Sequence, residues 1–340
     1  MPFVNQGAWI PSKGARIEVR HSKTVDPGEG EVLIQNHAWG INPIDGKMQS
    51  LGIQLDSYPT MFGCDVAGEV VAVGENVTTL KVGGRVLAHP LGLQSKRECE
   101  LAFQLYSIVE ARWAVPIPAD MPYEEAAKLP LGILTATTGL YTSQHRALPL
   151  PTLKPTPQDG TLLIWGGSSN VGAAANQLAT ASGFAVVSTA SVANHEMVRK
   201  LGVVEMFDHR SPSVVLDLVE HLRRKTVLGA FDAIGTAQTT KTIAEILSQL
   251  GGGRITSTLP NVNDLPPTVT GKQIFAPASF LHEPAIGEAV WHNFLPQALQ
   301  NGQIRSVLKT CIAGRGLESI QTGIDEVSNG VSATKVVVVA

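Results

Sequence analysis

One stretch of the chain, residues 161–191, restricts the possible folds more than any other. Residues 161–165 are mostly apolar and predict a buried strand, which a turn with three glycines follows. The small and apolar residues 171–181 predict a helix, and residues 185–189 predict a second strand. A strand, a glycine turn, a helix and a strand in this order predict a βαβ unit, in which a pyrophosphate binds at the helix N-terminus.

The three glycines of this turn have separate expected roles. Gly166 and Gly167 let the backbone approach the phosphates, and Gly172 lets the helix lie close to the strand. Ser169 stands where the GxGxxG pattern has its middle glycine, so the turn departs from the full pattern. A purely structural turn is the alternative, but the flanking strand and helix favour a dinucleotide site.

Size, charge and cysteine content exclude several classes of protein. The 340 residues are too many for one compact core and predict two domains. A net charge of -3 argues against nucleic acid and acidic membranes as partners. No apolar run approaches the roughly 20 residues that span a bilayer, and the N-terminus lacks the apolar core of a signal peptide, so we expect a cytoplasmic protein. The three cysteines are far apart, which indicates neither a disulfide framework nor a structural zinc site.

The chain before residue 125 is rich in β-forming residues. Strands are expected at 31–39, 66–73 and 77–80, with a further turn and strand in 81–87. Short strands at this spacing predict a small barrel. Two helices are then expected, at 123–128 and 131–143, and the prolines of 148–159 predict a rigid surface connector.

After the βαβ unit, expected helices and strands continue to alternate. The helices are expected at 194–200, 214–223 and 239–250, and the strands at 203–207, 230–234, 254–259 and, as a sixth, 273–275. This alternation predicts a doubly wound parallel sheet. The tail is different: we expect helices at 292–300 and 317–328, an extended segment at 304–312 and a closing strand at 335–339.

Seven short stretches carry a family likeness, and they are 40–47, 63–68, 74–86, 129–132, 166–172, 207–210 and 332–335. Through them the chain resembles the medium-chain dehydrogenase/reductase superfamily over nearly its whole length. Within it, the chain is most similar to the fungal branch of zinc-less alcohol-dehydrogenase-like proteins and trans-acting enoyl reductases, beside the quinone oxidoreductases. The resemblance implies an α/β fold in which a β-rich, GroES-like barrel domain (1–128 and 285–340) surrounds a Rossmann domain (129–284).

The resemblance also bears on zinc. Zinc-dependent members have a Cys where this chain has Asn42, and a Gly-His-Glu where it has Gly63, Cys64 and Asp65. Catalytic zinc needs three protein ligands around an open position. Asn42 is a poor ligand, and Cys64 is left without its partner, so we expect no metal site.

The end of the second expected strand bears on the choice of cofactor. An acidic residue there would bind the ribose 2′-hydroxyl of NAD, but Ser191 and Asn194 stand in this region and the first acid is Glu196. Both polar side chains can donate to a 2′-phosphate, and Arg199 and Lys200 add positive charge nearby. This pattern favours NADPH over NADH. The alternative, which can coexist, is that Ser191 and Asn194 form a plain helix cap.

The resemblance adds contacts to the cofactor. It places His209 beside the adenosine, and Lys47 and Lys335 near the phosphates or the nicotinamide. The full set of expected cofactor contacts is Asp45, Lys47, Gly166, Gly167, Ser168, Ser169, Asn170, Val171, Ser191, Asn194, His209, Leu259, Thr334 and Lys335.

The expected chemistry follows from the missing metal. Without a Lewis acid, the oxidation of a plain alcohol lacks its usual means of stabilising the alkoxide. Hydride delivery to a polarised C=C bond remains feasible, because hydrogen bonds can hold the enolate charge. The resemblance places Asn42, Lys47 and Thr135 at the cleft as catalytic residues. Thr135 can instead bond back to its own helix, and Tyr58 and Tyr106 are candidate proton donors with a structural alternative.

The sequence thus favours an NADPH-dependent, zinc-independent reductase that acts on an activated C=C bond of a small molecule, such as an enone, an enoyl thioester or a quinone, as a monomer or homodimer. One alternative is a metal-free alcohol or aldehyde dehydrogenase. Another is an NADPH-binding protein with lost or redirected catalysis. Residues 94–100 keep this last alternative open, since Leu101 stands where relatives have a glycine.

Overall fold

The computed structural model describes residues 4–260 and 262–340, which form two compact units. Unit 1 comprises the chain up to Leu131 together with Lys309–Ala340, and unit 2 comprises Gly132–Leu308. The sequence analysis placed 285–308 in the first domain, whereas the structure places these residues in unit 2. Arg305 shows the reason, because it exchanges two backbone hydrogen bonds with the side chain of Gln177, at 2.8 and 3.2 Å, within unit 2.

Unit 2 is built on a six-stranded parallel sheet with the strand order β10-β9-β8-β11-β12-β13. This order is that of a doubly wound dinucleotide-binding sheet, so the predicted fold class is confirmed. In chain order the strands are β8 (Thr161–Trp165), β9 (Ala185–Ala190), β10 (Glu205–Asp208), β11 (Val227–Asp232), β12 (Gly253–Ser257) and β13 (Val269–Gln273). The sixth strand exists, but it ends at Gln273, where the sequence analysis expected it to begin.

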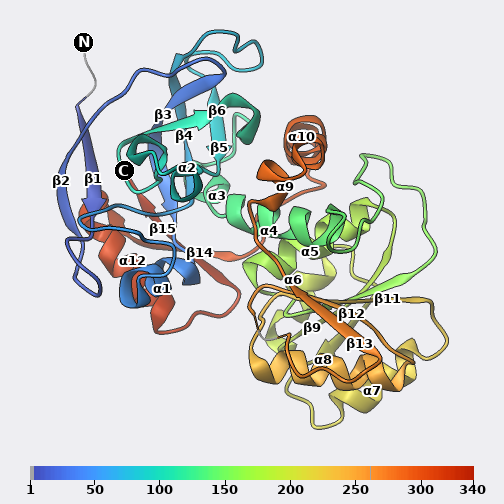
Figure 1. Ribbon diagram of the computed structural model, residues 1–340. Helices are drawn as coiled ribbons and strands as arrows, with labels where there is room; N and C mark the ends of the chain where they lie inside the picture. Colours follow the sequence, from blue (N-terminus) through green and yellow to red (C-terminus); the bar gives the residue numbers. More distant parts are fainter. Residues whose placement is uncertain (1–3, 261) are drawn as a thin grey trace. The chain divides into compact units, whose positions relative to one another are not determined.

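Helices cover both faces of this sheet (Figure 1). Those on one side include α4 (Pro130–Tyr141) and α5 (Asn170–Ala181); those on the other are α7 (Val214–Leu222) and α8 (Ala237–Gln249). Buried residues of α7 and α8 pack on the sheet, among them Leu218, Leu222, Ile243 and Leu247. The remaining helices are η3 (Val192–Asn194), α6 (His195–Arg199), α9 (Ala278–Leu281), α10 (Pro284–Glu288), η4 (Ala289–Phe294) and α11 (Leu295–Gln300).

Unit 1 is β-rich, as predicted. Its seven-stranded sheet has the order β14-β15-β3-β4-β5-β7, with β6 also paired to β3, and β1 and β2 form a separate pair. The strands are β1 (Asn5–Trp9), β2 (Glu18–Ser22), β3 (Glu31–Gly40), β4 (Asp65–Val73), β5 (Arg85–Ala88), β6 (Tyr106–Glu110), β7 (Ala114–Pro116), β14 (Lys309–Arg315) and β15 (Thr334–Val339). Because β15 pairs with β3, the C-terminal strand completes the sheet of the N-terminal part.

The prediction of a strand at 77–80 is wrong. Val70 of β4 donates to the carbonyl of Gly84 and accepts from the amide of Gly83, both at 2.8 Å. These bonds connect β4 directly to the residues before β5, so the intervening segment loops out. The extended segment expected from residue 304 also begins later, at Lys309.

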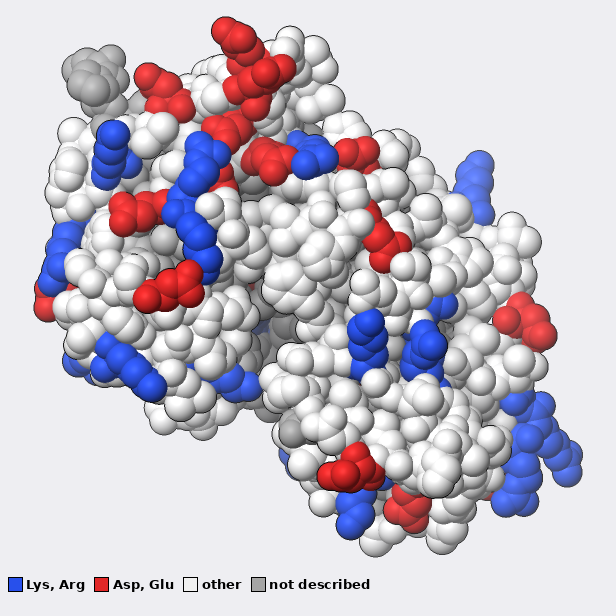
Figure 2. All heavy atoms as spheres, viewed as in Figure 1, with Lys and Arg blue, Asp and Glu red and all other residues white. Residues whose placement is uncertain are grey.

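The helices of unit 1 are short. They are α1 (Pro43–Leu51), α2 (Gly92–Ser95), η1 (Glu98–Glu100), η2 (Ala111–Trp113), α3 (Tyr123–Ala126), η5 (Leu317–Ser319) and α12 (Ile320–Ser328). Among the described residues, no helix of either unit has the length and apolar content to cross a bilayer. Figure 2 shows acidic and basic side chains interspersed over a mostly uncharged face.

Candidate active site

The glycine turn between β8 and α5 has the close backbone approaches that the sequence predicted. A Cβ on Gly167 would lie 2.0 Å from Ser188 Oγ, and a Cβ on Gly172 would lie 2.2 Å from the carbonyl oxygen of Gly166. Gly166 itself has a φ of 80°, which side-chain-bearing residues rarely adopt. The turn therefore requires glycine at these three positions, and it ends at the N-terminus of a 12-residue helix, which suits an anion.

Ser169, the residue in place of the middle glycine, is the N-cap of α5. Its Oγ accepts a hydrogen bond from the amide of Gly172 at 3.0 Å. The sequence analysis assigned Ser169 to the turn but missed this role. A Ser before a helix of small residues was the available signal, since Ser is among the preferred N-caps.

The carboxyl edge of the sheet brings together several of the expected cofactor contacts. Ser191 follows β9 and is buried, and Asn194 Nδ2 donates to its Oγ at 3.0 Å. Asn194 Nδ2 also approaches Ser168 Oγ of the glycine turn at 3.5 Å. Leu259 follows β12 at the same edge and is half-buried. In open parallel sheets this is the edge at which ligands bind.

Asp208 is a carboxylate at this edge that the sequence analysis did not consider. It ends β10 and lies opposite Ala190 of β9 in the sheet register. Asp208 accepts from the amide of Arg210 at 3.0 Å, and the ring of His209 lies 4.0 Å away. The sequence pattern considers only acids that follow β9 along the chain, whereas parallel pairing brings Asp208 from the next strand. Asp208 therefore places a carboxylate at the edge of the sheet where Ser191 and Asn194 also lie.

Unit 1 contains a second group of expected site residues, which form a buried polar cluster. Lys335 Nζ donates to Asn42 Oδ1 and, at 3.0 Å, to Asp65 Oδ2. Asn42 Nδ2 donates to the same Asp65 oxygen at 2.9 Å, while the amide of Leu131 donates to Asp65 Oδ1 at 2.8 Å. Asp45 Oδ2 accepts from the amide of Asn42 at 2.7 Å. The three side chains of Asn42, Asp65 and Lys335 thus form a closed triangle of hydrogen bonds, which we call the Lys335 triangle.

The titration of this cluster reflects its burial. Burial alone would raise the pKa of Asp65, but the Lys335 ammonium, with His89 and Asn42, holds that pKa below its ordinary value. Burial raises the pKa of Asp45 to about 7, against the opposing effects of the Asn42 amide and Lys335. Burial, together with Asp45 and Asp65, raises the pKa of the Cys64 thiol. Cys64 thus lies in a buried, acidic environment that disfavours the thiolate.

This donor set does not fit a catalytic zinc ion. Asn42 has both amide atoms engaged in the Lys335 triangle, and the Lys335 ammonium stands beside Asp65, where it would repel a cation. Within residues 4–260 and 262–340, no three His, Cys, Asp or Glu side chains are grouped so that they could hold a metal.

The other expected site residues are more dispersed. Lys47 is half-buried on α1, and Thr334 is half-buried at the start of β15, where its hydroxyl donates to the carbonyl of Ser332 at 2.9 Å. Thr135 is buried on α4. Of the two candidate proton donors, Tyr58 has a buried hydroxyl with no hydrogen-bond partner among the described residues, and Tyr106 lies on β6.

An ion pair connects residues 94–100 to β3. In this segment the sequence departs from its relatives. Arg97 bonds both Glu31 of β3 and Glu100 of η1. Leu101 and Phe103 follow as buried residues, and Phe103 packs against Phe62 with a ring separation of 5.4 Å. The departure therefore lies in a well-packed part of unit 1.

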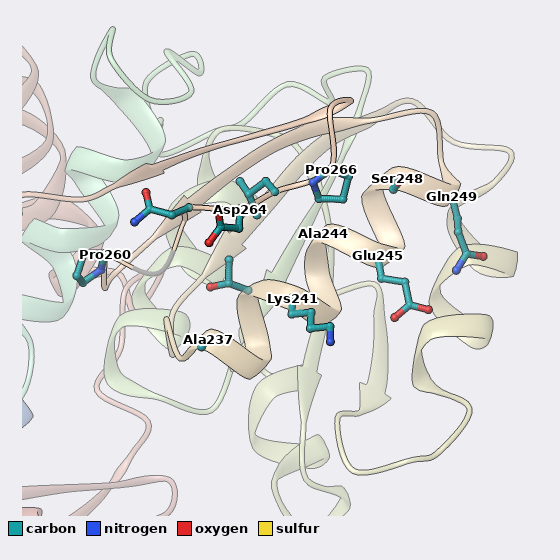
Figure 3. Close-up of a pocket in the computed structure, with 12 residues that line it drawn as sticks. Ala237, Lys241, Ala244, Glu245, Ser248, Gln249, Pro260, Asp264 and Pro266 are labelled. Carbon is teal, nitrogen blue, oxygen red and sulfur yellow. The ribbon is translucent and has the colours of Figure 1, made fainter.

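Unit 2 also has a groove of about 850 Å³ between α8 and residues 260 and 263–266. Figure 3 shows Lys241 and Glu245 projecting from α8, with Asp264 and Pro266 on the facing segment. None of the expected site residues lines this groove. It is therefore separate from both groups described above.

Comparisons with known proteins agree with this architecture. Residues 28–119 match the family model of the alcohol dehydrogenase GroES-like domain. The chain is 38% identical to the zinc-binding alcohol dehydrogenase domain-containing protein cipB of Emericella nidulans, over 98% of each chain. It is also 38% identical to the trans-enoyl reductase himH of Aspergillus japonicus, over 99% of this chain and 97% of that relative.

A solved structure shares the fold at lower identity. The CurK enoyl reductase superposes with a TM-score of 0.78 at 20% identity, over 98% of this chain and 99% of that one. The family model, the two full-length relatives and the two-unit architecture lead to one conclusion. The chain belongs to the medium-chain dehydrogenase/reductase superfamily.

Proposed function

We propose that this protein is an NADPH-dependent, zinc-independent reductase of activated C=C bonds in small molecules. The observation that carries the proposal is the glycine turn of unit 2. Glycine at 167 and 172 lets the turn pack directly against β9 and the end of β8, and the turn leads into the N-terminus of a 12-residue helix, where free amides suit a phosphate.

The residues proposed to hold the cofactor lie along the carboxyl edge of the unit 2 sheet. The first residues of α5 would hold the pyrophosphate through backbone amides, which have no partner inside a helix, while the amides of Gly166 and Gly167 donate to Thr189 of β9 and fix the turn against the sheet. Ser191, Asn194 and His209 would lie beside the adenosine, with Ser191 and Asn194 as donors to the 2′-phosphate. When bound, NADPH supplies the hydride.

Two lines of support favour an activated C=C bond as the acceptor. The Lys335 triangle occupies the residues that would have to bind a catalytic metal, so an alkoxide would lack metal stabilisation. An enolate needs only hydrogen-bond donors, and we propose Thr135 and Lys47 for this role. The himH relative is named a trans-enoyl reductase, as is tndF of Aspergillus flavipes.

A second candidate is a metal-free alcohol or aldehyde dehydrogenase. The name of the relative cipB includes an alcohol dehydrogenase domain, which supports the alcohol chemistry of this candidate, although that name calls the domain zinc-binding. The two candidates differ in their acceptors, because a C=C reductase should respond to polarisation of the double bond and not to a simple carbonyl group.

The test is NADPH oxidation measured across enones, quinones, enoyl thioesters, ketones and aldehydes. We expect the first three classes to be reduced and simple ketones hardly at all, with deuterium from labelled NADPH on the β-carbon of the reduced enone. Thr135→Val should lower kcat by about tenfold, a loss of about 1.4 kcal/mol in transition-state stabilisation. NADPH affinity should stay within a few fold.

Other outcomes identify the alternatives. Preferential reduction of aldehydes would support the dehydrogenase. Tight NADPH binding without transfer to any acceptor would point to lost or redirected catalysis, and the proposed reaction would then be wrong.

A further inference from the structure

The Lys335 triangle gives Lys335 a different environment from that of a phosphate-binding lysine. Its side chain is 4% exposed, and those of Asn42 and Asp65 are 2% and 0% exposed. Two of its three ammonium hydrogens have acceptors inside unit 1, on Asn42 Oδ1 and Asp65 Oδ2. The ammonium is thus enclosed, and its negative partner belongs to the protein.

Asp65 depends on this ammonium for its charge balance. Its carboxylate is fully buried, and its other close partners are neutral amides, apart from His89, whose Nδ1 lies 3.6 Å from Asp65 Oδ1. Removing one member of a buried ion pair leaves an uncompensated charge, which is strongly destabilising. A cofactor phosphate that drew the Lys335 ammonium away from Asp65 would leave Asp65 in that state.

The triangle also connects to the start of α1. Asn42 is the N-cap of this helix, and its amide donates to Asp45 Oδ2 in the first turn at 2.7 Å. The amide of the preceding residue, Ile41, donates to the carbonyl of Val336, which follows Lys335 in β15, at 2.9 Å. The side chain and the strand of Lys335 therefore hold the first turn of α1 together, and Lys47 lies on the second turn.

We propose that Lys335 is a positioning residue: it is the internal counter-ion of Asp65, fixes the Asn42 side chain and thereby sets the position of Lys47, without binding the cofactor phosphates. The part that concerns Lys47 rests on the proposed function. The counter-ion role stands on the geometry of unit 1 alone.

The first test separates charge balance from cofactor binding. Lys335→Met should lower the melting temperature strongly, and the neutral pair Lys335→Met with Asp65→Asn should recover most of that loss. The neutral pair should bind NADPH within threefold of wild type, with an unchanged salt dependence. Lys309→Met, an exposed lysine at the start of β14, is the matched control and should change neither property.

Asp65→Asn alone provides an independent measurement, because it releases Lys335 from its partner. If Lys335 bound the phosphates, the Asp65→Asn variant would bind NADPH more tightly than wild type. If Lys335 is the counter-ion of Asp65, the variant should have an unchanged or lower affinity for NADPH and a lower melting temperature. Tighter NADPH binding by Asp65→Asn, or tenfold weaker binding by the folded neutral pair, would overturn the proposal.

The second test is a mutant cycle with Lys47. The neutral pair and Lys47→Met should each lower kcat by about tenfold, and their combination should lower it no further, because both changes remove the same interaction. If the two reductions in kcat multiplied in the combined variant, Lys335 would not act through Lys47. If wild-type protein reduced no acceptor at all, the proposed function would fail, while a recovered melting temperature and unchanged NADPH affinity would still support the counter-ion role.

Discussion

At the scale of single residues, we expect the proposed preference for NADPH to depend on Ser191. Ser191→Asp would add a carboxylate at the carboxyl edge of the sheet, where Asp208 of β10 already stands opposite Ala190. Wild-type protein should bind NADPH at least about tenfold tighter than NADH, or about 1.4 kcal/mol, and Ser191→Asp should erase this difference. Titration of each protein with NADPH and with NADH measures the two dissociation constants.

Ser191→Ala is the control for this prediction, because it removes the hydroxyl without adding charge. It should weaken NADPH binding by only a few fold. Equal wild-type dissociation constants for the two dinucleotides would contradict the prediction, because the protein would then not discriminate between NADPH and NADH.

Asn42 shows what a sequence can and cannot indicate about a side chain. The residue types around it predicted that the zinc ligand set is absent. They did not predict that both of its amide atoms would be engaged with Asp65 and Lys335, because Lys335 is 293 positions away in the chain. Partners on distant strands are set by the sheet order, which local patterns do not contain.

At the scale of elements, we expect the N-cap of α5 to affect both stability and cofactor binding. Ser169→Ala should lower the free energy of unfolding by about 1 kcal/mol, since it leaves the Gly172 amide without its acceptor. It should also weaken NADPH binding severalfold, because this cap lies in the glycine turn. Urea unfolding and cofactor titration measure the two effects.

Helix α8 offers a matched control for the cap. Thr236 Oγ1 accepts from the amide of Thr239 at 3.2 Å in the same way, at a helix with no expected phosphate contact. Thr236→Ala should cost similar stability and leave the affinity for NADPH unchanged. Equal weakening of NADPH binding by both variants would show that the α5 cap has no special relation to the cofactor.

The same elements show which parts of the fold can be predicted from sequence patterns. The βαβ unit was predicted almost to the residue, because apolar strands and a glycine turn are local signals. The strand expected at 77–80 was wrong, since Val70 pairs with Gly83 and Gly84 and leaves that segment outside the sheet. Its apolar residues were consistent with a strand, and only the pairing decided otherwise.

At the scale of the whole molecule, the chain inserts unit 2 into unit 1. The sequence predicted that both chain ends share one domain, which β15 explains by pairing with β3. The second boundary lies near residue 308, not 284, because α10, η4 and α11 belong to unit 2. The sequence of such short helices does not indicate to which unit they belong.

The last prediction concerns the need of the whole protein for metal. Structural and catalytic metals contribute folding energy or activity that a chelator removes. In this chain the Lys335 ammonium already balances Asp65, and both amide atoms of Asn42 are engaged in hydrogen bonds. Purified protein should therefore contain substoichiometric zinc, and a chelator should change neither the melting temperature, nor NADPH affinity, nor the reductase activity.

Metal analysis before and after chelation, with unfolding and activity measured on the same samples, tests this prediction. Added zinc should not raise the melting temperature, because Asn42 and Lys335 would have to break their hydrogen bonds to admit a cation. One equivalent of tightly held metal, lost together with activity, would contradict the prediction. The Lys335 triangle would then have to open in solution, and the chemistry of the site would be closer to that suggested by the name of cipB.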